Sequence, residues 1–309
     1  MNFEPSAQVN LFVHNALLND LINLYNKNKL PNKILLSGEK GIGKSTLAYH
    51  LINHILSQNE EYSYEHDNYR ISNKNKSFKL IQNKTSPNFY LINVTKDKKN
   101  IDINQIRNLI LNLYKSSFNS KPRFVLIDNI ELLNLNSVNA LLKILEEPND
   151  NINFLLINNN KKILSTLKSR CLEFKVFLSR TEIVEVINNI LNEDIYDIMN
   201  NELINSFATP GKLCEIIKFS KDIKINLKDY DLKNLILLIL ETKIYKKEKS
   251  INEILYFLIE LYFRNNSSIT NIYLLELSNY FLKKINNTKI YNLDEEILYI
   301  EFKDKVLNA

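Results

Sequence analysis

Most of the chain's glycine lies in a single loop. Three of the four glycines in this 309-residue sequence fall within residues 38–45, which read Gly-Glu-Lys-Gly-Ile-Gly-Lys-Ser. Glycine tolerates positive φ angles and close backbone approach, so such a loop can turn several N–H groups toward one oxyanion. The apolar run 34–36 before it predicts a strand, and residues 45–48 after it predict the start of a helix. This part of the chain is therefore expected to form the strand–loop–helix unit of a phosphate-binding P-loop. An incidental glycine-rich turn is the weaker alternative.

The loop supplies the candidate nucleotide-binding residues. In the G-x-x-x-x-G-K-[ST] pattern, Lys44 is expected to reach the β- and γ-phosphates of ATP, and the Ser45 hydroxyl to ligate Mg²⁺ through the bound nucleotide. The residues expected to surround the phosphates are Gly38, Gly41, Gly43, Lys44, Ser45 and Thr46.

Composition restricts the class of protein. The length predicts two or three domains, and an apolar content of 45% is ample for a core. No apolar run approaches the roughly 18 residues of a membrane span, and the first residues do not resemble a signal peptide. Cys171 and Cys214 are too few for a disulfide framework or a four-thiolate zinc site. We therefore expect a cytoplasmic protein without zinc or a membrane partner. The net charge of +5 permits contact with nucleic acid without requiring it.

Strand and helix patterns alternate up to about residue 178, which predicts an α/β fold with a parallel sheet flanked by helices. The strands are expected at 33–37, 89–94, 123–128, 154–157 and 172–177. The helices are expected at 8–29, 44–57, 101–114, opened by Asp102, and 137–147, stopped by Pro148. Residues 58–86 are polar and show no steady period, so we expect a surface insertion with at most a short helix.

Beyond residue 179 the pattern is helical only. Helices are expected at 181–192, 194–207, 210–220, 231–243, 251–265, 269–285 and 293–307, with a charged joint at 221–229. The predicted domains are a P-loop nucleotide-binding domain (1–178), a helical lid (179–222) and an all-helical C-terminal domain (223–309).

An acidic residue follows the most apolar strand. Asp128 ends the run 124–127 and is expected to hold the Mg²⁺ water shell beside the P-loop. ATPases of this broad type place a glutamate next, to orient the attacking water, but here the next residue is Asn129. An amide cannot accept a proton, and losing a general base costs on the order of 10²–10⁴ in rate. Glu131 lies too far along the turn to be a secure replacement. We therefore hypothesise that the chain binds nucleotide and hydrolyses it poorly.

Two further motifs resemble one family. Residues 139–148 read Asn-Ala-Leu-Leu-Lys-Ile-Leu-Glu-Glu-Pro, which closely resembles the NALLK-x-LEEP helix of bacterial clamp-loader subunits, and residues 169–171 match their SRC motif. With the P-loop and Asp128 the resemblance covers residues 6–215. It implies the AAA+ fold, and a five-subunit ring that uses ATP to open the sliding clamp and place it on primed DNA for DNA polymerase III.

Within this family the sequence resembles the delta-prime subunits more than the gamma/tau motors. Asn129 replaces the motor's catalytic glutamate, and Ala-Thr-Pro-Gly at 208–211 replaces its Gly-Ser-x-Arg, leaving Lys212 as a loose substitute for the lid arginine. Residues 58–86 also lack the four cysteines of the motor's zinc module, and the sequence ends at 309 without the long motor's tail. The resemblance implies an accessory subunit with impaired ATPase and with gamma/tau, delta, the clamp and primed DNA as partners. The alternatives are an active gamma/tau-like motor and, more remotely, a free-standing P-loop ATPase or kinase.

The resemblance also implies roles for two polar residues. Arg170, one of only six arginines in a lysine-rich chain, would be an arginine finger offered in trans to a neighbouring subunit. An ion pair with an acid such as Glu173 is the alternative. Asn158, after the strand 154–157, lies where these ATPases place a γ-phosphate sensor, although Ile157 also falls in register.

Other features have structural interpretations first. His50 and His54 match half of a zinc helix, but a surface or half-buried pair is favoured, and Cys171 is expected to be a small buried residue. The lysine runs at 96–99 and 246–249 are expected to be solvated, with DNA contact as the minority alternative. Helices beyond residue 230 are apolar on more than one side, which fits either a collar packed against other subunits or a self-contained bundle.

Overall fold

The structure is a computed structural model that describes residues 3–95, 98–115, 119–146, 151–205, 208–266 and 272–308. The chain divides into two compact units, Met1–Val186 and Ile187–Ala309. Across the described residues, no helix combines the length and apolar character that crossing a bilayer requires.

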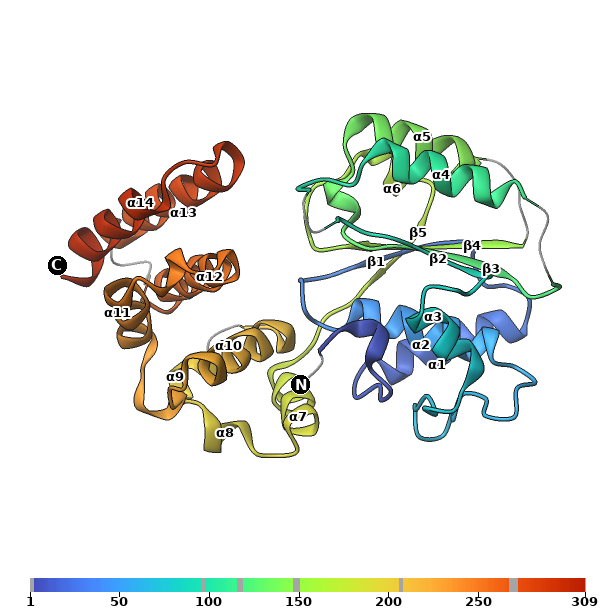
Figure 1. The fold of residues 1–309 in the computed structure, drawn as a ribbon, viewed down its shortest axis with the longest axis horizontal. Coiled ribbons are helices and arrows are strands. Elements are labelled where there is room, and N and C mark those ends of the chain that lie inside the picture. Colours follow the sequence, from blue (N-terminus) through green and yellow to red (C-terminus); the bar gives the residue numbers. More distant parts are fainter. Residues whose placement is uncertain are drawn as a thin grey trace. The chain divides into compact units, whose positions relative to one another are not determined.

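The first unit is built on a five-stranded parallel sheet in the order β2-β3-β4-β1-β5 (Figure 1). Its strands are β1 (Lys33–Ser37), β2 (Phe89–Ile92), β3 (Arg123–Ile127), β4 (Ile152–Asn158) and β5 (Leu172–Lys175). All five lie where the sequence predicts strands, so the predicted parallel α/β sheet is confirmed. Pairing sets Ser37 level with Asn158, and Ile127 level with Leu156, so the carboxyl ends of β1, β3 and β4 meet at one edge.

Helices cover both faces of this sheet (Figure 1). One face carries α1 (Asn15–Asn26), α2 (Lys44–Leu56) and α3 (Lys76–Gln82); the other carries α4 (Ile103–Leu113), α5 (Leu135–Glu146) and α6 (Ser165–Lys168). Side chains alternate between faces along a strand. Phe124 and Leu126 of β3 therefore pack into the core under α2, and Val125 and Ile127 into the core under α4 and α5.

The predicted start of α4 at Asp102 is confirmed by a capping box. The Asp102 carboxylate accepts a hydrogen bond from the Asn104 N–H at 3.1 Å, and the Gln105 side chain accepts one from the Asp102 N–H at 3.0 Å. These bonds satisfy donors that the first turn of a helix leaves free. The other end of α4 is capped by Arg123, whose guanidinium donates to the carbonyls of Leu113 and Lys115.

The N-terminal segment differs from the prediction. The sequence predicts one helix over 8–29, but α1 begins only at Asn15, and residues 9–11 are extended instead. The Leu11 N–H donates to the Tyr69 carbonyl at 3.0 Å, and the Ile71 N–H donates to the Val9 carbonyl at 2.8 Å. These backbone bonds to a distant stretch replace the helix, and Leu11 is buried by them.

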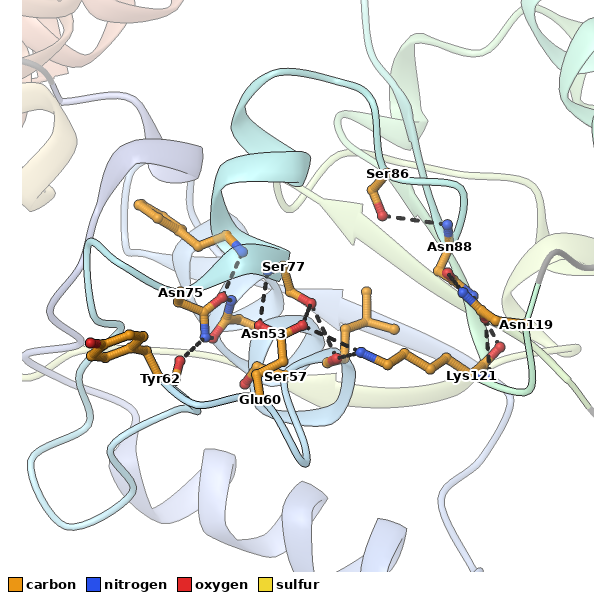
Figure 2. Close-up of polar contacts among 12 residues, drawn as sticks. Asn53, Ser57, Glu60, Tyr62, Asn75, Ser77, Ser86, Asn88, Asn119 and Lys121 are labelled. Atoms are coloured by element: carbon orange, nitrogen blue, oxygen red, sulfur yellow. Dashed lines mark hydrogen bonds and ion pairs between the residues drawn. The ribbon is translucent and has the colours of Figure 1, made fainter.

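Residues 58–86 are also not a simple surface insertion. Their apolar side chains Tyr64, Ile71, Phe78 and Ile81 are buried in the core that covers α2. Polar residues reinforce this packing (Figure 2). The fully buried Asn75 caps α3 by accepting from the Phe78 N–H at 2.7 Å, and it also accepts from Asn53 of α2 at 3.0 Å. Most of the segment is exposed and the expected short helix is α3, but the prediction missed the buried apolar groups because they are spaced irregularly.

The second unit is all helical. Together with α7 (Arg180–Leu191), the helices after β5 are α8 (Ile195–Ile198), α9 (Asn201–Asn205), α10 (Pro210–Ile223), α11 (Leu232–Thr242), α12 (Lys249–Asn266), α13 (Ile272–Tyr291) and α14 (Glu295–Phe302). The single helix predicted over 194–207 is two short ones, because Met199 is extended at φ −133° and ψ 148°. The predicted end of this helix at Phe207 lies outside the described residues, and so does Pro148, the predicted stop of α5.

Helix α12 is the centre of this unit. It packs against α10, α11 and α13, and its apolar residues Leu255, Tyr256, Leu258 and Leu261 are buried by them. Phe263 adds a ring cluster with Phe281 and Phe302. The apolar circumference of α12 is thus explained within the chain itself, and most of the large exposed apolar side chains described in this unit lie instead on or beside α13 and α14.

His50 gives the first unit a specific dependence on acid. The ring is fully buried in α2, bonded to the Tyr64 hydroxyl at 2.9 Å and the Gln8 carbonyl at 3.3 Å, and burial lowers its pKa to about 4. The unfolded chain takes up this proton near pH 6.5, whereas the folded chain resists it, so stability falls as the pH drops below 6.5. We expect His50 to lower the free energy of unfolding by about 2 kcal/mol between pH 7.5 and pH 5.

Urea unfolding of wild type and His50→Gln at the two pH values measures this effect. Burial also lowers the pKa of His14 and His54, and both remain in the variant, so the difference between the two pH dependences isolates His50. Equal losses of stability in the two proteins would contradict the assignment.

Candidate functional site

The loop between β1 and α2 has the backbone that its glycines predict. Gly41 and Gly43 have φ of 88° and 94°, in the left-handed region that disfavours any residue with a Cβ. At Gly38 the restriction is space, because a Cβ there would lie 2.2 Å from the carbonyl oxygen of Val176. All three glycines are therefore required by the local geometry, and α2 begins at Lys44, the residue after Gly43.

Lys44 lies across this loop. Its buried ammonium donates to the carbonyls of Gly38 at 2.9 Å and Glu39 at 2.5 Å. Burial lowers the pKa of Lys44 to about 8, against the opposing charges of Asp128, Glu131 and Glu39. The desolvated Lys44 ammonium lies beside the unpaired N–H groups at the start of α2, and this arrangement is suited to binding a phosphate.

Asp128 lies beside the start of α2. The Ser45 hydroxyl donates to its carboxylate at 3.2 Å, although the two residues are 83 positions apart. Burial raises the pKa of Asp128, and the bond from Ser45 and the charge of Lys44 partly offset this. A hydroxyl and a carboxylate are the hard oxygen donors that Mg²⁺ takes, usually together with substrate phosphates. Among the described residues no group of three or more His, Cys, Asp or Glu is arranged to hold a metal ion by itself.

Asn129 is held in a left-handed turn, at φ 60° and ψ 53°. Its amide donates to Asn93 at 3.0 Å and accepts from Asn159 at 2.7 Å. Asn159 also donates to the Glu131 carboxylate at 2.8 Å. Two bonds thus fix the amide of Asn129, and Glu131, the next acid after it in the sequence, is itself bound by the Asn159 amide.

Glu131 is nevertheless close to the loop. Its charge raises the pKa of both Lys44 and Asp128. The sequence gives no secure indication of this, because the distance depends on the 3-10 turn at Ile130–Leu132.

The three residues at the end of β4 have different surroundings. Ile157 is buried in the core on the α2 face. Asn158 closes its own turn, donating to the Lys161 carbonyl at 3.1 Å and accepting from the Lys161 N–H at 3.2 Å, while its carbonyl accepts from the Gly38 N–H. Asn159 is the amide that reaches toward the Asp128 turn. Sequence reasoning did not single it out, because asparagine is common in this chain and carries little signal.

Arg170 lies near the amino ends of the strands, whereas the P-loop lies at their carboxyl ends. It precedes the first residue of β5, whereas the P-loop follows the last residue of β1, and these strands are parallel neighbours. The length of β5 alone separates the two levels by about 10 Å. Arg170 pairs with Glu146, the last residue of α5, and donates to the Thr166 carbonyl at 2.8 Å. The expected alternative partner Glu173 pairs instead with Lys168.

The remaining candidates are structural. His50 is fully buried, so the prediction of a surface or half-buried pair was wrong for it; His50 and His54 do share one face, and both pack edge-on to Tyr64. Cys171 is half-buried, and burial raises the pKa of its thiol to about 11.

The two lysine runs differ in how much the structure describes. Lys98 pairs with Asp102, and Lys246 with Glu296. Lys96 and Asp97 of the first run lie outside the described residues.

The fold and the site together define a class. They are those of an AAA+ module. The parallel sheet has the order β2-β3-β4-β1-β5, with a P-loop after β1, an acid after β3 and a polar residue at the end of β4. The following unit is helical, as expected for this class.

Comparison with known proteins gives the family. A family model described as "DNA polymerase III, delta subunit" matches residues 13–178, more than half of the chain. The chain belongs to this family of DNA polymerase III clamp-loader subunits.

Named relatives carry more than one subunit name. The chain is 33% identical over 151 residues, 47% of its length, to a delta' subunit of Buchnera aphidicola subsp. Baizongia pistaciae. It is 27% identical over 236 residues, 74% of its length, to a gamma subunit of Buchnera aphidicola subsp. Schizaphis graminum. A crystal structure of a gamma-subunit-related protein from Thermotoga maritima matches 91% of this chain and 96% of its own, at 18% identity and a TM-score of 0.48. The matched segments span 44% of the first relative's length and 62% of the second's.

The contact between Ser45 and Asp128 predicts a specific defect. Asp128→Asn keeps an acceptor for Ser45 and removes the charge that would hold Mg²⁺ water. We expect the Mg²⁺ concentration that half-maximally tightens ATP binding to rise roughly 10–100-fold, as is typical when an outer-shell partner is lost. Titration of the purified chain with a fluorescent ATP analogue at several Mg²⁺ concentrations measures this. Affinity in EDTA is the internal control, and an unchanged Mg²⁺ dependence would exclude Asp128 from the metal site.

Proposed function

We propose that this chain is the delta-prime-type subunit of a bacterial clamp loader. In this role it is a scaffold that helps to load the sliding clamp on primed DNA in the cytoplasm, with motor and delta subunits as partners. It donates Arg170 to ATP bound by a neighbouring motor subunit, and its own ATP hydrolysis is weak or absent.

The observation that carries the proposal is the environment of Asn129. The position after Asp128 is where a catalytic acid would stand, and it holds an amide tied to Asn93 and Asn159. An amide cannot take the proton of an attacking water. A glutamate here could not donate to Asn93, and it would add a further negative charge beside Asp128 and Glu131.

The lid segment supports the same conclusion. Gly211 lies in the first turn of α10, where motors carry an arginine. The neighbouring Lys212 pairs with Glu215 at 2.6 Å, and its ammonium lies 5.5 Å from the centre of the Phe257 ring. A lysine held in this way is a poor substitute for a free guanidinium.

The position of Arg170 supports action in trans. It lies near the amino ends of the strands, away from the chain's own P-loop at their carboxyl ends. Its pair with Glu146 is solvent-exposed, with 34% and 55% of the two side chains accessible. Exposed pairs of this kind contribute about 0–1 kcal/mol, so a γ-phosphate can displace Glu146. Fingers that stabilise phosphoryl transfer are worth roughly 10³–10⁵ in rate.

ATP with Mg²⁺ would be held by this chain's P-loop. The residues are Gly38, Gly41, Gly43, Lys44, Ser45 and Thr46, with Asp128 on the Mg²⁺ side and Asn158, together with its neighbour Asn159, at the end of β4. The metal would supply charge neutralisation between the phosphates. ATP that is bound but not hydrolysed would stabilise the folded subunit and would not drive the clamp-loading cycle.

The remaining residues would form the lid (179–222) and the collar (223–309), after the nucleotide-binding domain (1–178). Six large apolar side chains on α13 and α14 are at least 57% exposed: Ile272, Tyr273, Ile290, Tyr291, Ile297 and Ile300. Exposed apolar surface on this scale is typical of an interface, and we assign it to the other collar helices of the ring.

An active gamma/tau-like motor is the second candidate. It is favoured by the complete P-loop, by the Ser45–Asp128 contact, and by the charge of Glu131 near Lys44. Family membership argues against a free-standing P-loop ATPase or kinase.

The test is DNA-stimulated ATPase of a complex reconstituted from this chain and the motor and delta subunits of its own organism. With Arg170→Ala we expect the rate to fall at least about 100-fold per site that receives the finger, given the size of finger effects. Arg170→Lys should restore little, because lysine lacks the planar fork. Arg180→Ala, which removes another exposed arginine, is the matched control and should leave the rate unchanged.

Sizing chromatography separates assembly from catalysis. If Arg170→Ala assembles normally and its ATPase rate is unchanged, Arg170 is not a finger and the chain is a passive scaffold. No assembly of the wild-type chain with these partners would contradict the clamp-loader role itself.

A further inference from the structure

We propose that His14 is a positioning residue for phosphate binding, because it orients the peptide between Ile42 and Gly43. This inference rests on the nucleotide binding proposed above. His14 lies outside the P-loop motif, 28 residues before Ile42, and no sequence pattern identifies it.

The contact is direct. His14 Nε2 lies 2.7 Å from the Ile42 carbonyl oxygen. A carbonyl only accepts, so Nε2 must carry the proton and donate it. The same ring edge covers the loop glycine, since a Cβ on Gly43 would lie 3.6 Å from Nε2 and 3.7 Å from Cδ2. The imidazole is therefore packed against the peptide whose oxygen it binds.

Fixing this carbonyl fixes the next N–H. The chain contains no cis peptide bond among the residues described, so the C=O of Ile42 and the N–H of Gly43 point in opposite directions across one plane. With the carbonyl turned toward His14, the Gly43 N–H points away from the ring. It then extends the row of N–H groups that the first turn of α2 leaves unpaired, and such a row binds anions. Without the bond, the Ile42–Gly43 peptide is freer to flip, because glycine tolerates either sign of φ, and it would then present its oxygen to the phosphate.

The backbone of His14 helps to place its ring. His14 has φ 69°, in the left-handed region, and it is the residue just before α1. Its own carbonyl accepts from the Leu18 N–H at 2.9 Å, so the ring projects from the start of a helix whose Leu18, Leu21 and Ile22 are buried.

The charges around the ring fit a neutral donor. Burial lowers the pKa of His14, Lys44 lowers it further, and the Ile42 bond and Glu182 oppose them. A neutral ring provides one donor and places no second cation beside Lys44.

A matched pair of variants tests the inference. His14→Gln keeps an N–H donor three bonds from Cβ, the same separation as in histidine, and His14→Met has the same shape without the donor. Both carry the same left-handed backbone, so their stabilities should change alike. Calorimetric titration of the purified chain with Mg·ADP should show that His14→Met binds about 3–10-fold more weakly than wild type, which is the effect of one hydrogen bond. His14→Gln should stay within about 2-fold of wild type.

The outcomes separate this inference from the broader proposal. Equal affinity in the two variants, or wild-type affinity in His14→Met, overturns the role of His14 and leaves nucleotide binding intact. A wild-type chain that binds no Mg·ADP overturns both His14 and the proposed nucleotide site, whereas the Arg170 assay still tests the scaffold and finger. Thermal unfolding of both variants shows whether a loss of affinity is only a loss of folded protein.

Discussion

The close packing of Gly38 between two strands is the constraint on which the rest of the site depends. Its N–H donates to the Asn158 carbonyl of β4, and the Val176 carbonyl after β5 approaches so closely that no Cβ fits. This packing is possible because β1 pairs in parallel with both β4 and β5. The same pairing brings Asp128 and Asn158 to the P-loop and leaves Arg170 at the far edge. In the proposed function, one end of the sheet would bind phosphate and the other would carry the finger, which is the asymmetry that a ring of similar subunits requires.

Local signals in the sequence predicted the parts of this arrangement that short-range chemistry determines. The glycine spacing predicted the loop, the apolar runs predicted all five strands, and Asp102 predicted the start of α4. The predicted fold class is confirmed because strand period, capping and turn residues all agree with one topology. Arg170 stood out because arginine is scarce in this chain, and Arg123, another of the six, also uses its guanidinium in a specific contact, at the end of α4.

Features that depend on contacts between distant segments could not be predicted. Residues 8–14 are amphipathic enough for a helix, yet Val9 and Leu11 bond to the stretch around Tyr69 and stay extended. The polar stretch 58–86 contains four buried apolar side chains and the Asn53–Asn75 bond, and neither could be predicted because neither has a regular period. The same limit applies to His14, Asn159 and Glu131, whose proximity to the P-loop depends on turns. In the second unit, the apolar circumference of α12 could not by itself decide between burial by its own neighbours and burial by other subunits.

In the proposed function this chain holds ATP without hydrolysing it, because an amide follows Asp128 where a base is needed. The most direct measurement is the fate of ATP on the isolated protein, incubated with Mg·ATP, separated from free nucleotide and analysed for the bound species. We expect the recovered nucleotide to remain ATP over many minutes, and Lys44→Ala to recover none. Sustained release of ADP and phosphate without partners, lost in Lys44→Ala, would contradict the account and identify the chain as a motor.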